Sequence, residues 1–160
     1  MAWNSPIVTP TGYMVWRLSI KWRTEVDRRL APLGLTHAQY VLMASLYGLT
    51  RTAGEKPSQR ELADFSGLEP IYVSKLLKGL EKDGFVRRTA NPADSRALEL
   101  EFTEAGLERV QSAMAIIRGY LDDVLAPIGG PDGEENQAFI RTLGTLLMGP
   151  PRSTTSKEGE

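Results

Sequence analysis

The sequence predicts a mainly α-helical fold of the α+β class, in which amphipathic helices surround one small β-hairpin. Three observations lead to this prediction. Apolar residues recur at intervals of three and four over most of the 160 residues, which is the period of an amphipathic helix. Two short helical segments joined by a tight turn occupy residues 58–83. Residues 98–102 then alternate strictly between apolar and acidic, the period of a half-buried strand.

The first helix is expected from about Thr11 to Leu30. Its apolar positions are Tyr13, Trp16, Leu18, Ile20, Trp22, Val26 and Leu30. The segment 32–34, Pro-Leu-Gly, should end it, because proline and glycine both disfavour continuation of a helix. Residues 1–9 before this helix are predicted to be a flexible arm.

The second helix should open at Thr36. Thr36 and Gln39 have the spacing of a capping box, in which each side chain hydrogen-bonds to the other residue's backbone N–H. We expect this helix to reach about Tyr47, with Gly48 and the polar residues 50–57 forming a loop.

The third helix begins with another capping box, formed by Ser58 and Glu61. Gly67 should stop it, because glycine readily adopts the left-handed conformation of a tight helix exit. Its small apolar face is predicted to consist of Leu62, Ala63 and Phe65.

The fourth helix is predicted to begin at Pro70, since proline suits the first helical position. Gly84 should follow its end. Its buried stripe is predicted to contain Val73, Leu76, Leu77 and Leu80, and the polar side chains lie away from the centre of that stripe.

A β-hairpin should follow, with strands at 85–89 and 98–102 joined by residues 91–96, which have turn chemistry. Together with the two helices before it, this hairpin makes the pattern of a winged helix-turn-helix. Its basic residues are Arg87, Arg88 and Arg96.

Two helices complete the chain. Thr103 should cap a long helix with a heptad seam, the pattern by which helix packs on helix, at Leu107, Val110, Met114, Ile117, Leu121 and Val124. Asp132 and Glu135 resemble a third capping box, opening a last helix with apolar residues Phe139, Ile140, Leu143, Leu146, Leu147 and Met148. The polar residues 150–160 are expected to be a flexible tail.

Composition excludes several classes of site. The chain has no cysteine and a single histidine, His37, so thiol chemistry and the usual His/Cys zinc sites are excluded, and no metal or cofactor is expected. No apolar run of about 20 residues and no signal-peptide pattern is visible, so a cytoplasmic protein is expected. The net charge of −1 carries no general nucleic-acid signature, but basic residues concentrate at 75–96.

The chain resembles the multiple-antibiotic-resistance regulator (MarR) family of bacterial transcription factors over residues 11–148. The motifs that carry the resemblance are PSQRELADFSGL, VSKLLKGLEKDGFVRR, NPADSRA and LEFTEAG. It implies a homodimer in which residues 10–35 and 103–149 are intertwined dimerisation helices. Residues 36–102 would be the winged helix-turn-helix DNA-binding domain, with the wing at 85–102. The implied function is that of a regulator, by family habit a repressor, on a pseudo-palindromic operator.

The resemblance also implies residue roles. The positions that match DNA-contacting residues are Ser58, Gln59, Arg60, Pro70, Ile71, Tyr72, Ser74, Lys75, Lys78, Arg87, Arg88, Asp94 and Arg96. Ser74 and Lys75 match base or phosphate contacts, Tyr72 could also meet a thymine methyl, and Lys78 is better suited to phosphate. Arg96 matches a minor-groove arginine oriented by Asp94. Arg87 and Arg88 are equally consistent with phosphate contacts and with solvated strand residues.

Many family members release DNA when a small phenolic or anionic molecule binds. Trp16, Arg17, His37 and Tyr40 resemble residues that line such a pocket, although core packing or surface exposure explains each of them as well. An enzyme is not expected, because no nucleophile–base pair or phosphate loop is visible. The alternative to a DNA-binding regulator is a winged-helix protein-interaction module.

Overall fold

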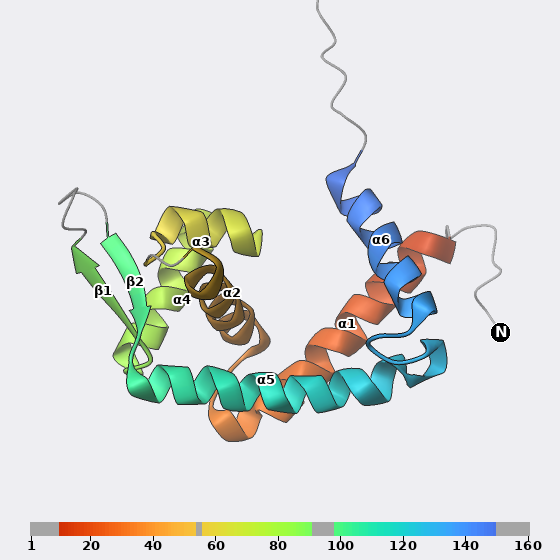
Figure 1. The fold of residues 1–160 in the computed structure, drawn as a ribbon, viewed down its shortest axis with the longest axis horizontal. Coiled ribbons are helices and arrows are strands. Elements are labelled where there is room, and N and C mark those ends of the chain that lie inside the picture. The colour runs from red at the N-terminus through yellow and green to blue at the C-terminus, as the bar shows by residue number, and fades with distance from the viewer. Residues whose placement is uncertain (1–9, 54–55, 91–97, 150–160) are drawn as a thin grey trace, which may run out of the picture. The chain divides into compact units, whose positions relative to one another are not determined.

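The computed structural model describes residues 10–53, 56–90 and 98–149. They form two compact units, one up to residue 117 and one from residue 118 on, and α5 runs through both (Figure 1). The elements in chain order are α1 (Pro10–Leu30), η1 (Ala31–Leu33), α2 (His37–Ala53), α3 (Gln59–Ser66), α4 (Pro70–Lys82), β1 (Val86–Ala90), β2 (Leu98–Phe102), α5 (Glu104–Leu125), η2 (Ala126–Ile128) and α6 (Glu134–Met148).

The junction between α1 and α2 confirms the sequence prediction. Gly34 adopts the left-handed conformation with φ 68° after η1. The Thr36–Gln39 capping box is present, with the Gln39 N–H donating to Thr36 Oγ1 at 3.2 Å and the Thr36 N–H donating to Gln39 Oε1 at 2.9 Å. The Asp27 carboxylate of α1 accepts the His37 N–H at 2.6 Å, so a side chain of α1 also satisfies the start of α2.

The end predicted for α2 was wrong. The helix continues through Gly48 to Ala53 instead of stopping near Tyr47. One helical glycine costs only about 1 kcal/mol relative to alanine, which packing can offset. A Cβ at Gly48 would lie 3.8 Å from the Phe65 ring, an ordinary van der Waals contact, so packing against that ring does not require glycine. The hydroxyls of Thr50 and Thr52 donate to backbone carbonyls one turn earlier in this last part of α2.

The core of the first unit lies among α2, α3, α4 and the hairpin, which gather together in Figure 1. Phe65 was predicted to share the apolar face of α3 with Leu62 and Ala63, but its side chain is 59% exposed. Leu76 is only half-buried, so the buried stripe of α4 is narrower than predicted. The fully buried side chains here are Leu42, Met43, Leu46, Leu62, Val73, Leu77, Leu80 and Leu100.

β1 and β2 form the predicted antiparallel hairpin, with Val86 opposite Phe102 and Ala90 opposite Leu98. The sheet has an addition that the sequence pattern did not reveal. Ser58 forms an isolated antiparallel bridge with Glu99, and the Leu100 N–H donates to the Pro57 carbonyl at 2.8 Å. The chain entering α3 is therefore bonded to the wing.

Thr103 caps α5 as predicted, because its hydroxyl accepts the Gly106 N–H at 3.0 Å. Two positions of the predicted seam, Val110 and Ile117, are buried within the chain, and the other four are more exposed. Leu107 is 39% exposed, and Met114, Leu121 and Val124 are only half-buried. The buried positions of α5 also have heptad spacing, but they include glycine, alanine and tyrosine, which were not counted when the seam was predicted from large aliphatic residues. They are Gly106, Val110, Ala113, Ile117 and Tyr120.

Arg109 of α5 joins two other parts of the first unit. Its guanidinium donates to the Leu33 carbonyl in η1 and lies over the Phe85 ring, 4.8 Å from the ring centroid. This arginine therefore connects the turn between α1 and α2 with the junction between α4 and β1.

In the second unit, the capping box predicted for Asp132 and Glu135 was wrong. Gly133 is the N-cap of α6 and provides no side-chain hydrogen bond. Asn136, which is 4% exposed, donates to the Pro131 carbonyl at 2.7 Å and holds the preceding turn. Within residues 10–53, 56–90 and 98–149, no helix is long and apolar enough to cross a membrane.

Candidate nucleic-acid interface

The N-terminus of α3 is held by the predicted capping box. Ser58 Oγ accepts the Glu61 N–H at 3.2 Å, and Glu61 accepts the Ser58 N–H at 2.7 Å. Hydrogen bonds from the Ser58 backbone and side chain lower the pKa of Glu61. Gln59 and Arg60 follow in the first turn, where Arg60 is exposed and Gln59 is half-buried.

The turn into α4 follows the sequence prediction closely. Gly67 has φ 68°, and its N–H donates to the Ala63 carbonyl at 3.0 Å. Pro70 then occupies the first position of α4. Because the turn is short and capped, the direction in which α4 leaves it is set by local backbone chemistry.

One face of α4 is buried and the opposite face is open to solvent. Val73, Leu77 and Leu80 are fully buried. The open face carries Ile71, which is 87% exposed, and two exposed lysines, Lys75 and Lys78, with the half-buried Ser74 beside them. We call the four residues Ile71, Ser74, Lys75 and Lys78 the α4 face. It combines an apolar side chain, a hydroxyl and two cations, all within two helical turns.

The two wing arginines have different surroundings. Arg87 is 63% exposed and lies 3.2 Å from Glu101, which also pairs with Lys56 at 2.6 Å. Hydrogen bonding to Lys56 lowers the pKa of the Glu101 carboxyl. The Arg87 guanidinium therefore remains open to a further anionic partner.

Arg88 is half-buried and paired within the chain instead. Its side chain is only 18% exposed and makes two hydrogen bonds to Glu81 of α4, with Nε 2.8 Å from Oε1. Its Nη1 lies 3.5 Å from Oε1 of Gln59. This ion pair lowers the pKa of Glu81. Through Glu81 and Gln59, Arg88 connects α4, β1 and the start of α3. Neither sequence interpretation of Arg88, as a phosphate contact or as a solvated residue, anticipated this internal role.

Asp94 and Arg96 lie outside the described residues, as does the rest of the loop between the strands. Their predicted roles stay predictions.

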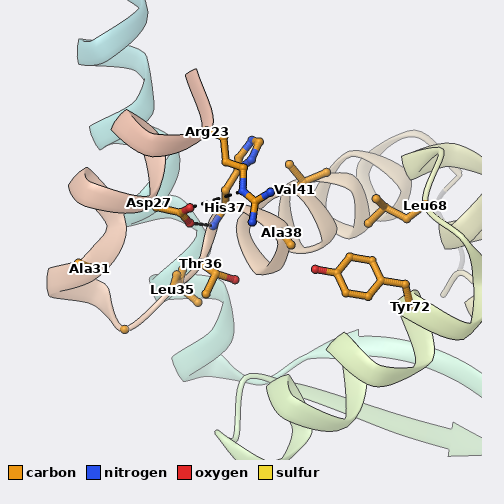
Figure 2. Close-up of a pocket in the computed structure, with 11 residues that line it drawn as sticks. Arg23, Asp27, Ala31, Leu35, Thr36, His37, Ala38, Val41, Leu68 and Tyr72 are labelled. Carbon is orange, nitrogen blue, oxygen red and sulfur yellow. Dashed lines mark hydrogen bonds and ion pairs between the residues drawn. The ribbon is translucent and has the colours of Figure 1, made fainter. Parts of the chain in front are cut away.

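A cavity of about 660 Å³ is lined by residues of α1, the turn after it and α2, together with Leu68 and with Tyr72 of α4 (Figure 2). His37 is the one residue of the four predicted effector contacts that lines it. Burial lowers the pKa of His37, and the nearby Asp27 opposes that effect. The polar lining residues are Arg23, Asp27, Thr36, His37 and Tyr72.

The other three predicted effector residues lie elsewhere. Trp16 is 56% exposed on α1, and Arg17 donates to the Tyr13 hydroxyl at 3.1 Å. Tyr40 is half-buried, and burial raises its pKa, but it does not line the cavity. The sequence missed Arg23, Asp27 and Tyr72 as cavity residues, because their convergence depends on the crossing of three helices.

Comparison with known proteins places this arrangement in a family. The model of the MarR family matches residues 35–98, which run from the start of α2 to the first residue of β2. The chain is 37% identical over 120 residues to the uncharacterised HTH-type transcriptional regulator YdcH of Bacillus subtilis, covering 73% of this chain and 81% of the relative.

The chain belongs to the MarR family. It is also 30% identical over 138 residues to the HTH-type transcriptional repressor Rv2887 of Mycobacterium tuberculosis, covering 85% of this chain and 94% of the relative. Among solved structures, it is similar to the M. tuberculosis regulator MosR in complex with DNA. That similarity has a TM-score of 0.67 and 28% identity, over 85% of this MarR-family chain and 94% of MosR. The predicted family and the winged-helix fold are thus confirmed.

Proposed function

We propose that this MarR-family chain is a sequence-specific DNA-binding transcriptional regulator, a repressor, that acts in the cytoplasm on a pseudo-palindromic operator. The α4 face carries the proposal. A helix whose solvent-facing side presents two exposed lysines, a half-buried serine and an exposed aliphatic side chain fits the major groove, which admits one α-helix and offers both phosphates and base edges. The similarity to MosR, solved with DNA, and to the repressor Rv2887 supports it.

The contacts divide by chemistry. Ser74 and Lys75, near the start of α4, are assigned to base edges or phosphate, and Lys78 to phosphate. Ser58, Gln59 and Arg60 are assigned to the DNA backbone at the start of α3. Arg87 is assigned to a flanking phosphate because its guanidinium is open. Arg88 is assigned a positioning role through Glu81.

We also propose a homodimer. Apolar side chains that single-chain packing leaves open lie on both terminal helices, and a second copy would cover them. On α1 they are Met14, Val15, Trp16, Leu18 and Ile20, and on α6 they are Phe139, Ile140, Leu146, Leu147 and Met148. By contrast, Ile117 is buried within one chain, so this residue contributes to the single-chain core. A two-fold dimer predicts half-sites separated by about 10 bp, one turn of DNA.

The dimer is tested by sedimentation velocity on the full chain. Leu147, 87% exposed, is replaced by Asp, with Thr142→Asp on the same helix as the matched control. A charge placed in a desolvated interface opposes association, so Leu147→Asp should lower the sedimentation coefficient to that of a monomer while the control does not. A wild-type protein that sediments as a monomer would contradict the dimer.

We propose in addition that the cavity between α1, α2 and α4 binds a small aromatic or anionic effector. Its volume lies within the range of about 300–1,000 Å³ typical of ligand pockets. Arg23 and His37 could meet an anionic group, and Leu35, Val41 and Leu68 provide apolar walls. Tyr72 belongs both to this cavity and to α4, so a ligand held against it would bias the position of the recognition helix.

Benzoate is a suitable first ligand for the cavity. It should weaken operator binding by the wild type, and Arg23→Gln should reduce that effect. No response of operator affinity to benzoate, or an undiminished response in the variant, would argue against Arg23 as the anion contact.

The function is tested by selecting bound duplexes from a random DNA library with the full-length protein. A two-fold symmetric motif is expected. Lys75→Ala should then weaken operator binding by about 1–3 kcal/mol if Lys75 reads a base. Lys21→Ala, which removes the same charge from an exposed position of α1, is the matched control and should bind normally.

The alternative is a protein-interaction module. Salt dependence separates the two, because an interaction module would bind duplex DNA weakly even at low salt. A DNA-binding protein should show a log–log slope of about −0.9 for each phosphate contact. No enriched motif together with a flat salt dependence would overturn the proposed function.

A further inference from the structure

Ile71 is far more exposed than the fold requires. It is 87% exposed on α4, whereas Val73, two residues later, is fully buried. No packing among the described residues accounts for an isoleucine at this position, and its exposure leaves most of one aliphatic side chain in water. A polar residue at this site would cost the fold nothing. The side chain is thus available for a contact outside the chain.

The neighbours of Ile71 indicate the kind of partner. Lys75 and Lys78 are exposed four and seven residues further along α4, so all three side chains project from the same side of the helix. An apolar protein surface would bury these two cations unfavourably. Double-stranded DNA presents phosphates to lysines and, on its major-groove floor, one apolar group, the C5-methyl of thymine.

Tyr72 is less suited to that methyl group than the sequence suggested. Its ring is turned into the cavity beside α2, with the hydroxyl directed toward Ala38 (Figure 2). It is 42% exposed, half as much as the adjacent Ile71. The two neighbours therefore point in different directions: Tyr72 toward the cavity and Ile71 away from the protein.

We propose that Ile71 selects thymine in each operator half-site by packing against its C5-methyl group. This inference rests on the proposed DNA-binding function and adds the base for which the α4 face is specific. Isoleucine has no hydrogen-bonding group, so its selectivity must come from apolar contact. Cytosine and uracil lack the C5-methyl and would leave part of the Ile71 side chain without a partner.

The test replaces individual thymines by uracil in the duplex selected from the random library. Uracil keeps the base pairing and removes only the methyl group. Each half-site is expected to contain one thymine that contacts Ile71. Replacement of this thymine in one half-site only should weaken wild-type binding by about fourfold, the loss expected for one buried methyl group. Substitution in both half-sites should weaken it by about fifteenfold if the half-sites act independently.

Variants decide whether Ile71 is the residue involved. Ile71→Ala should bind the thymine and uracil duplexes equally, and Ile71→Val should show an intermediate difference. Because Ile71 is exposed, the thermal stability of both variants should match that of the wild type. Lys78→Ala is the control: it should weaken binding to both duplexes while the thymine–uracil ratio stays that of the wild type.

Two results would overturn the inference while leaving the proposed function intact. One is wild-type binding that does not respond to uracil at any position. The other is an undiminished response in Ile71→Ala, which would assign the methyl contact to another residue. Absence of specific DNA binding by the wild type would overturn the proposed function as well, so the two failures are distinguishable.

Discussion

Replacement of Gly106 by alanine tests the packing between α5 and the junction of α4 with β1. Gly106 is buried in the first turn of α5, directly against the backbone of Phe85. A Cβ on Gly106 would lie 1.8 Å from the Phe85 carbonyl oxygen and 2.6 Å from its carbonyl carbon. The first distance is 1.6 Å short of the 3.4 Å at which ordinary contact begins. A flexible side chain could turn away, but this obstacle is backbone.

The same carbonyl oxygen accepts the Thr103 N–H at 3.1 Å, so moving α5 away would also break a bond at the helix start. Overpacking typically costs about 1–3 kcal/mol, and a backbone obstacle places this case at the upper end. The higher helix propensity of alanine stabilises α5 by about 1 kcal/mol and offsets part of this cost. The expected net loss is about 2 kcal/mol or more, which lowers Tm by roughly 4–8 °C in a protein of this size.

Thermal unfolding followed by circular dichroism at one fixed protein concentration measures the effect. Gly119→Ala is the matched control, since it lies in the same helix and an added Cβ there would meet no atom within 4 Å. That control should unfold at the wild-type temperature or slightly above it, because alanine favours the helix. If Gly106→Ala were as stable as Gly119→Ala, the close approach of α5 to Phe85 would be refuted.

Three further predictions concern the interface. Ser58→Ala removes the cap of α3 and should cost about 1 kcal/mol in urea unfolding; an unchanged midpoint would mean that the capping box contributes nothing. Arg88 lowers the pKa of Glu81 below its ordinary 4.5, so the pair stabilises the fold above that pH and loses its contribution as the pH falls through the lowered value. The stability difference between wild type and Glu81→Gln should therefore shrink from pH 7 to pH 3, and a constant difference would argue against the ion pair. Lys78→Ala should make the salt slope of DNA binding shallower by about 0.9 for each phosphate that Lys78 neutralises, and an identical slope would remove Lys78 from the phosphate-binding residues.

The features of the interface that depend on neighbouring residues could be predicted from the sequence. The capping boxes at Thr36 and Ser58, the exit at Gly67 and the start of α4 at Pro70 each depend on backbone chemistry within four residues. The period of α4 likewise separated its buried face from its exposed lysines. These features set the direction of α4, whereas the candidate DNA-contacting residues came from the resemblance to the MarR family.

Features that depend on contact between distant segments could not be predicted. Arg88 meets Glu81 and Gln59 only because β1, α4 and α3 converge, and its spacing in the sequence is equally consistent with a phosphate contact. The buried positions Gly106 and Tyr120 of α5 were missed because neither residue carries an aliphatic side chain. The burial of these two residues depends on which other segments pack against α5 in the folded chain; for Gly106 this is the backbone of Phe85.

The order of elements, the family and the residues of the α4 face are therefore properties of the sequence, because helix period, capping and turn chemistry act between near neighbours. The tertiary structure decided which charges are already paired, where a cavity forms between α1, α2 and α4, and that Ile71 projects outward while Tyr72 turns inward. These outcomes depend on the crossing of helices, because burial and ion pairing are set by whatever surface lies opposite a side chain.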